Sequence, residues 1–217
     1  MNTVLTSRWT KAILFVLCLV PFAFLARGFY LAFWGGNPNA LGPNPIEYIT
    51  HETGDWTIRL LLITLTITPL RLLLKQPLLV RYRRMLGLFA FFYSVCHFTI
   101  WFALDKDFHL SEMWADVLKR RFITVGMLGL ALMIPLAITS TNGWVKRLKY
   151  KRWQNLHKLV YFSAAAGVIH YYWLVKSDIR WPLTYGAILA VLLLYRWVHA
   201  RSTARPAAKP VASAARI

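Results

Sequence analysis

Three histidines lie in or at the edge of long apolar segments, where an ionisable side chain is costly and therefore suggests a function. His97 lies eight residues before Asp105, and His170 lies six residues before the lysine that ends its own segment. If both segments are helices running the same way, each histidine lies roughly 9–12 Å inside the same end of its helix. Two imidazoles at matched depth on neighbouring helices are suitable axial ligands for a haem iron. The alternative is that both are hydrogen-bonding residues that join helices without a metal.

His157 precedes His170 by thirteen residues, which is about 19.5 Å along a helix. That separation would suit a second haem, stacked across a membrane from the first. However, thirteen residues at about 100° each leave the two side chains some 140° apart, and Arg84 stands at the matching depth of the third apolar segment. A second haem would need another ligand, such as His199. The sequence therefore predicts His97 and His170 as ligands of one haem iron, and His157 either as a ligand of a second or as a hydrogen-bonding residue.

These histidines must be positioned by membrane helices, because apolar residues make up 58% of the 217-residue chain and come in long blocks. Six blocks approach or exceed the roughly 20 residues that a helix needs to cross a bilayer. They span residues 12–33, 56–74, 85–104, 122–139, 156–175 and 181–199. The pattern predicts an all-α membrane protein in which residues 1–200 form a six-transmembrane-helix bundle, with no separate soluble domain. Residues 201–217 are rich in Ala, Pro and Arg and are predicted to form a disordered basic tail.

The distribution of charge predicts the orientation of this bundle. The net charge is +18, which in a soluble protein would suggest nucleic-acid binding. If the amino terminus is cytoplasmic, the cytoplasmic segments hold 18 Lys and Arg residues and no acid, whereas the other side holds eight Lys and Arg residues and all eight acids. This is the positive-inside pattern with both termini cytoplasmic. Anionic lipids are therefore the expected partners of the basic face, and nucleic acid is not.

The connecting segments place the remaining histidines outside the apolar core. Residues 35–56 are rich in Gly, Pro and Asn and are predicted to form a turn-rich loop, with His51 on its surface. Residues 105–121 repeat apolar side chains at helical spacing and are predicted to form an amphipathic helix on the outer surface, with His109 exposed. Pro77 argues against one continuous helix through the basic segment that joins the second and third blocks.

Several stretches together resemble a known family, and their order and spacing carry the resemblance. They are "HETG" at 51–54, "TPLRLLLKQPLLVRYRRMLGL" at 68–88, "CHF" at 96–98, "KRRFITVGMLGL" at 119–130, "LAITSTNG" at 136–143 and "KRWQNLHKLVYFSAAAGVIHYYWLVKSD" at 151–178. The chain resembles the MsrQ family, the haem-binding membrane subunits of the bacterial system that reduces methionine sulfoxide in periplasmic proteins.

The resemblance implies a ferric-reductase-like transmembrane domain in the bacterial inner membrane, with b-type haem associated with His97, His157 and His170. It also implies that electrons come from the quinone pool, with FMN associated, and pass to a periplasmic molybdopterin-containing catalytic partner, MsrP. The chain would then be an electron-transfer subunit of an oxidoreductase without catalytic residues of its own. The wider superfamily often carries two histidines on each of two helices. This sequence lacks one of them on its third apolar segment.

Two other functions remain open at this stage. A stand-alone ferric-reductase-like protein would suit the fold, but the chain has no Rossmann G-x-G-x-x-G and no attached nicotinamide domain. A transporter or non-redox scaffold is disfavoured by the lack of a visible internal repeat and of acids within the apolar blocks. The "RYRR" run at 81–84 could bind a flavin or headgroup phosphate, or could serve only orientation and general lipid binding.

Overall fold

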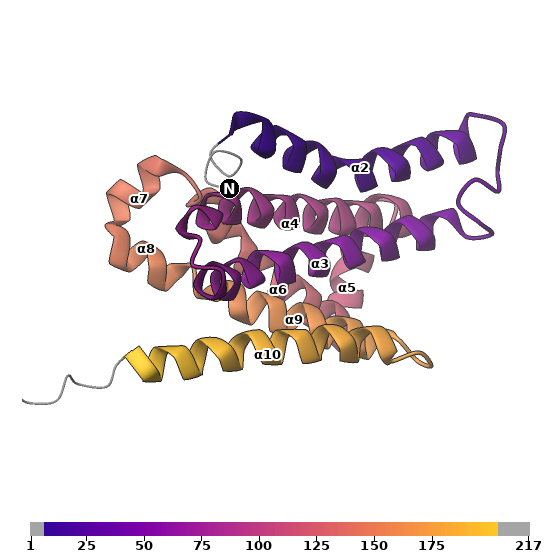
Figure 1. The fold of residues 1–217 in the computed structure, drawn as a ribbon. Coiled ribbons are helices and arrows are strands. Elements are labelled where there is room, and N and C mark those ends of the chain that lie inside the picture. Colours follow the sequence, from indigo (N-terminus) through magenta and orange to yellow (C-terminus); the bar gives the residue numbers. More distant parts are fainter. Residues whose placement is uncertain (1–6, 204–217) are drawn as a thin grey trace, which may run out of the picture.

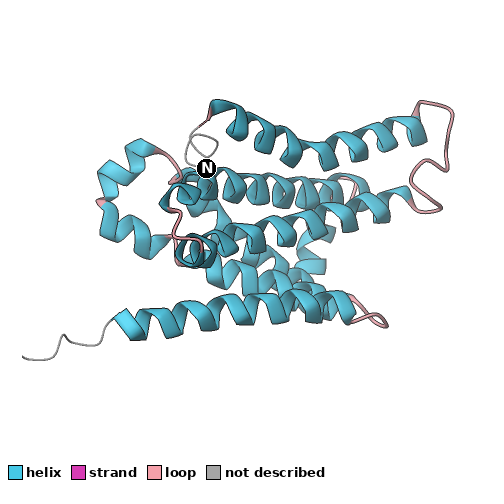
Figure 2. Cartoon of the chain, viewed as in Figure 1, coloured by secondary structure: helices cyan, strands magenta, loops and turns pink. Residues whose placement is uncertain are grey.

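The computed structural model describes residues 7–203, and these residues form helices and loops without any strand (Figures 1 and 2). The helices are α2 (Arg8–Phe33), α3 (Pro45–Leu73), η1 (Pro77–Leu79), α4 (Val80–Ile100), the π-helical η2 (Trp101–Asp105), α5 (Leu110–Lys119), α6 (Arg121–Ile138), α7 (Asn142–Leu148), α8 (Tyr150–Leu156), α9 (Leu159–Leu174) and α10 (Arg180–Thr203). The all-α prediction is confirmed for the described residues. The predicted tail lies outside them, apart from residues 201–203, which end α10.

The long helices run side by side and define two ends of a bundle (Figure 1). We call the end that carries η1, α7 and α8 the basic end, and the end that carries α5 and the loops 34–44 and 175–179 the acidic end. Within the described chain, five helical stretches are long and apolar enough to cross a membrane: Arg8–Phe33, Pro45–Leu73, Pro77–Asp105, Arg121–Ile138 and Arg180–Ser202. The predicted span at 156–175 is the exception. It forms α9, which has only 16 residues.

Two helix pairs make up the centre of the bundle. α3 packs mainly against α4, and α6 packs mainly against α9, whereas contacts between the two pairs are much fewer. α10 lies against α9 and α3, and α2 lies on the outer side of α3 and α4 (Figure 1). One buried apolar cluster, around Leu61, Phe89 and Tyr93, fixes the α3/α4 pair to α2. A second cluster, around Leu65, Ala164 and Leu189, joins α3 to α9 and α10.

α3 begins eleven residues earlier than the sequence analysis predicted, at Pro45 rather than at residue 56. The Asn44 side chain accepts a hydrogen bond from the Glu47 backbone N–H, and Pro45 occupies the first turn, where its missing N–H costs nothing. The Asn-Pro pair is therefore a helix start here and not a turn. As a result His51 belongs to a helix, and Asp55 lies inside a candidate membrane span. The expectation of acid-free spans was wrong, whereas His51 is exposed as expected, although on a helix and not in a loop.

Other local predictions are confirmed. Residues 110–119 form the amphipathic helix α5. The helix is also interrupted at Gln76, after which Pro77 begins the short helix η1. The basic segment after α6 contains two short helices, α7 and α8.

The hydroxyl of Tyr93 connects α4 to α2 at the proline of α2. Tyr93 is fully buried. Its hydroxyl accepts a hydrogen bond from the Phe22 N–H (3.0 Å) and donates one to the Cys18 carbonyl (2.8 Å). These two backbone groups are four residues apart, so an uninterrupted helix would join them directly. Pro21 lies between them, and α2 is bent in this region (Figure 1). The tyrosine hydroxyl thus satisfies a backbone donor and acceptor at a bend.

Tyr93→Phe should therefore destabilise the protein by about 1–3 kcal/mol, because it leaves two buried backbone groups without their partner. The measurement is thermal unfolding of the purified protein in neutral detergent. Tyr82→Phe, another buried tyrosine of α4, serves as the comparison. A melting temperature unchanged by Tyr93→Phe would show that the bend does not depend on this hydroxyl.

Candidate functional site

A cavity of about 530 Å³ lies between the α3/α4 and α6/α9 pairs. This is within the usual size range of ligand sites, about 300–1,000 Å³. The cavity reaches the acidic end, where Glu47, Asp105 and Arg120 line it. Deeper in the bundle its walls are mostly apolar. The apolar and aromatic lining residues include Ile58, Leu61, Phe98, Trp101, Ile123, Leu130 and Met133.

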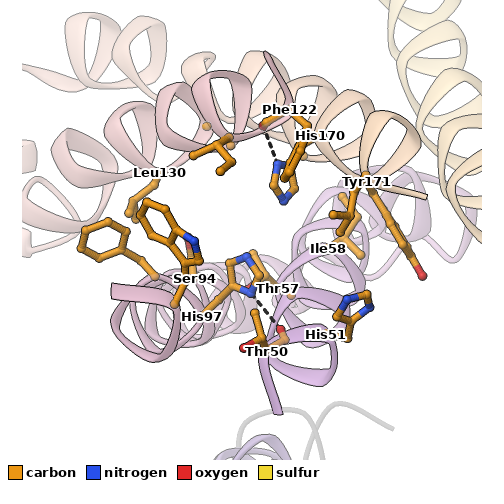
Figure 3. Close-up of a pocket in the computed structure, with 18 of the residues that line it drawn as sticks. Thr50, His51, Thr57, Ile58, Ser94, His97, Phe122, Leu130, His170 and Tyr171 are labelled. Atoms are coloured by element: carbon orange, nitrogen blue, oxygen red, sulfur yellow. Dashed lines mark hydrogen bonds between the residues drawn. The ribbon is translucent and has the colours of Figure 1, made fainter. Parts of the chain in front are cut away.

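His97 and His170 face each other across this cavity (Figure 3). Their ring centres are 6.1 Å apart, and the ring planes are nearly perpendicular, at 84°. His97 comes from α4 and His170 from α9, so each helix pair contributes one imidazole. The matched depth expected from residue counting is therefore present in the fold.

Each of these imidazoles is held by a backbone carbonyl. The distance from His97 Nδ1 to the Thr50 oxygen is 2.8 Å, and that from His170 Nδ1 to the Phe122 oxygen is 2.6 Å (Figure 3). Because a carbonyl can only accept, Nδ1 carries the proton and donates in both rings. Nε2 is then the unprotonated nitrogen in each neutral imidazole, which is the form that binds a metal.

A glycine lies under each ring, four residues after the carbonyl that the ring binds. A Cβ atom at Gly126 would come within 2.7 Å of His170 Nδ1, and one at Gly54 would come within 3.2 Å of His97 Nδ1. A side chain at position 126 would therefore displace the imidazole of His170, whereas one at position 54 would need a shift of only a few tenths of an ångström in His97. We call each combination of carbonyl and glycine a histidine seat: Thr50 with Gly54, and Phe122 with Gly126. Sequence reasoning missed both seats, although a glycine inside an apolar helix is a signal for close approach.

The residues present could hold the metal of a cofactor between two facing imidazoles. Two imidazoles bound to opposite sides of one iron, each with its nitrogen about 2 Å from the metal, have ring centres roughly 6 Å apart. The observed spacing of 6.1 Å matches this arrangement. His51, expected on the surface, lines the same cavity, as does Tyr171 (Figure 3).

Comparison with known proteins assigns the family. Residues 53–168 match the family model described as "Ferric reductase like transmembrane component". A protein from Herminiimonas arsenicoxydans is 54% identical over 86% of this chain and 83% of its own length. Proteins from Caulobacter vibrioides (49% identical, 86% of each chain) and Xanthomonas euvesicatoria pv. vesicatoria (46% identical, 94% of each chain) are also similar. All three are named "Protein-methionine-sulfoxide reductase heme-binding subunit MsrQ".

The chain belongs to the MsrQ family. No solved structure matches it. The segment that matches the ferric-reductase-like model contains His97 and His157, and His170 follows its end by two residues. The matched segment also covers most of the two histidine seats of this MsrQ-family chain. Gly54, Phe122 and Gly126 lie within it, and Thr50 lies three residues before its start.

His157 lies apart from the His97 and His170 pair and does not line the cavity. It is the C-cap of α8, and its ring packs against that of Trp153 with a centre-to-centre distance of 3.8 Å and an angle of 30° between the ring planes. Its Nδ1 lies 3.0 Å from the Trp153 carbonyl oxygen. The buried Nε2 has no well-aligned partner among the described residues, although the Leu136 carbonyl is nearby. His199, considered above as a second ligand, stacks on Tyr195. The role of His157 as a haem ligand stays a prediction.

The mouth of the cavity is held by an ion-pair network that should respond to pH. Lys106 Nζ lies 2.8 Å from one carboxylate oxygen of Asp116, and Arg120 Nε lies 3.3 Å from the other. The hydrogen bond from Lys106 is the main cause that holds the pKa of Asp116 below its usual value. Because the folded-state pKa is lowered, the stabilisation is complete above the unfolded value of about 3.9 and is lost as pH falls through the folded value.

Asp116→Asn should therefore cost up to about 1 kcal/mol at neutral pH, as expected for a pair near the surface. The variant should also lose less stability than the wild type as the pH falls below 4. Thermal unfolding between pH 3 and pH 7 tests both expectations. Glu112→Gln, an exposed change on the same helix, is the control. Parallel pH profiles for wild type and Asp116→Asn would contradict the assignment.

Proposed function

We propose that this chain is a haem b electron-transfer subunit that passes electrons from the quinone pool to a periplasmic methionine-sulfoxide reductase of the MsrP type. The observation that carries the proposal is the pair of facing imidazoles, His97 and His170, each with Nδ1 bound to a carbonyl and Nε2 left for a metal. The names of the relatives, which describe a heme-binding subunit of a protein-methionine-sulfoxide reductase, support it. When bound, a b-type haem supplies reversible one-electron transfer.

In this proposal the chain binds, orients and encloses the cofactor. His97 and His170 hold the iron, and the carbonyls of Thr50 and Phe122 fix the orientation and basicity of the two rings. The deeper walls of the cavity are mostly apolar, and an environment of this kind helps to set a redox potential. The sulfoxide chemistry belongs to the partner, so we assign no catalytic residue to this chain. FMN and quinone remain partners implied by family resemblance.

We further propose six membrane crossings, with both termini in the cytoplasm and residues 1–200 as a single transmembrane domain. α6 runs from the acidic end to the basic end, and α10 runs in the same direction (Figure 1). The chain must therefore return between them through α9, despite the shortness of that helix. The positive-inside rule then places the basic end in the cytoplasm of a bacterial inner membrane. The cavity would thus lie near the periplasmic face, close to a periplasmic partner.

The experiment starts from protein purified after haem-supplemented expression. Reduced-minus-oxidised spectra should show a b-type haem. A quinol should reduce it, and adding the periplasmic partner with a methionine-sulfoxide substrate should reoxidise it. Ferric citrate serves as a comparison acceptor, because the family model is ferric-reductase-like. Folded protein without a Soret band would contradict the proposal. Reoxidation by ferric citrate but not by the partner would favour the stand-alone reductase instead.

A further inference from the structure

Three arginines from different helices converge at the basic end of the bundle, far from the cavity. They are Arg71 at the end of α3, Arg83 near the start of α4 and Arg196 near the end of α10. We call them the arginine cluster. Arg83 interacts electrostatically with the other two and with the hydroxyl of Tyr161. Arg196 donates to that hydroxyl (2.8 Å) and to the Leu65 carbonyl, and its guanidinium lies 5.3 Å from the centre of the Tyr161 ring.

Within the part of the chain that the structure describes, no carboxylate pairs with the arginine cluster. None of the ion pairs found in residues 7–203 involves its members. Seven of the eight acids of the sequence occur in the first part of α3, in η2, in α5 and in the loop between η2 and α5, and the eighth, Asp178, lies in the loop 175–179, so all eight are towards the acidic end. The Nε atoms of Arg71 and Arg196 are buried, and neither has a hydrogen-bond partner among the described groups.

Like charges gathered in a partly buried place are costly unless an anion accompanies them. Arg196 already donates hydrogen bonds to the Tyr161 hydroxyl and the Leu65 carbonyl, but these uncharged groups do not neutralise its positive charge. An anion with several oxygens would satisfy the remaining donors, and guanidinium groups match phosphate oxygens in fork geometry. The neighbouring exposed Arg84 differs, because both of its terminal nitrogens lie 2.9 Å from the Asn142 side-chain oxygen.

We propose that the arginine cluster is a binding site for a phosphate group, formed by Arg71, Arg83 and Arg196 with the hydroxyl of Tyr161. Its place at the basic end of helices that are membrane-spanning by composition favours the headgroup of an anionic phospholipid. The phosphate of a soluble compound, such as a nucleotide, shares the same chemistry and is the other source. The inference is independent of the haem and of the direction of electron flow.

The test uses the full-length, haem-loaded protein in neutral detergent. Thermal unfolding is followed while dioleoylphosphatidylglycerol, dioleoylphosphatidylcholine or inorganic phosphate is titrated. We expect phosphatidylglycerol to raise the melting temperature of the wild type more than phosphatidylcholine does. In Arg71→Gln the apparent affinity should fall about tenfold or more, as expected for the loss of a charge-assisted contact. Arg152→Gln, which removes an exposed charge at the same end of the bundle, should behave like the wild type.

The outcomes separate the two sources. Stabilisation by phosphatidylglycerol, but not by inorganic phosphate, supports a lipid headgroup. Stabilisation by inorganic phosphate, weakened in Arg71→Gln, supports a soluble phosphate compound. Equal responses of Arg71→Gln and Arg152→Gln, or no response of the wild type to either anion, would overturn the proposal. If Arg71→Gln does not fold, Arg71→Lys and Arg83→Gln replace it. Lysine keeps the positive charge but cannot donate the two parallel hydrogen bonds of a guanidinium group. Circular dichroism and a single gel-filtration peak report folding in every variant, and the Soret band, recorded separately, tests only the haem proposal.

Discussion

Replacing His170 with alanine should abolish the low-spin b-type spectrum of the purified protein and remove most of its haem. The substitution deletes one of the two imidazoles that face the cavity 6.1 Å apart, and an iron held from one side only loses its six-coordinate, low-spin state. Loss even of a residue that merely supports a metal ligand typically weakens metal binding 10–100-fold, so loss of the ligand itself should exceed that. Haem content per protein and reduced-minus-oxidised spectra measure the effect, and His97→Ala should behave in the same way.

Two further histidine variants make this prediction specific. His109→Ala removes an exposed histidine outside the cavity and should leave haem content unchanged. His157→Ala should retain the spectrum of the His97 and His170 site, and a fall of about half in haem content would identify a second haem at His157. Added imidazole should partly restore the low-spin spectrum of His170→Ala, because the deleted ring leaves room for it. A wild-type spectrum and haem content in His170→Ala would refute the ligand assignment.

Replacing Gly126 with alanine should impair haem retention almost as severely, although it adds only a methyl group. The new Cβ would come within 2.7 Å of His170 Nδ1, which is too close for the ring to keep its hydrogen bond to Phe122. In the absence of haem the ring can move aside, but a ring bound to iron cannot. We therefore expect at least a tenfold loss of haem affinity, together with a shifted midpoint potential. Haem transfer to apomyoglobin and a redox titration measure these two quantities.

Alanine substitutions at two other glycines provide graded comparisons for the loss of haem affinity. At Gly54 the added Cβ would come within 3.2 Å of His97, so Gly54→Ala should be milder than Gly126→Ala. At Gly87, also inside a helix, the nearest atom is 3.7 Å away on Thr64. Gly87→Ala should be neutral or stabilise the protein by up to about 1 kcal/mol, because alanine is the better helix former. If all three variants retained haem equally, the histidine seats would have no part in binding it.

Residue counting along the sequence was enough to place His97 and His170 at one depth, because helices convert sequence separation into distance in a simple way. The same reasoning failed at Pro45, where Asn and Pro are as compatible with a turn as with a helix start, and only packing decides between them. This error placed His51 in a loop, whereas it is an exposed residue of α3 that also lines the cavity.

The histidine seats and the arginine cluster show a different limit of sequence reasoning. Gly126 and His170 lie on separate helices, and no local pattern reveals that one supports the other. Arg71, Arg83 and Arg196 were recognised as basic residues on one side of the membrane, but the interactions of Arg83 with the other two arginines, and of Arg83 and Arg196 with Tyr161, depend on how α3, α4, α9 and α10 pack. Side-chain partners across helices are a property of the tertiary structure, and composition and spacing carry little information about them.

The separation of the bundle into two helix pairs has a consequence for biogenesis. The seat for His97 lies entirely within the α3/α4 pair, and the seat for His170 lies entirely within the α6/α9 pair. The α3/α4 pair can therefore complete its seat as soon as its own helices have entered the bilayer, before α6 and α9 have been synthesised. If His97 and His170 bind one cofactor as proposed, loading would bring the two helix pairs together without unfolding either, and the bound cofactor would link them.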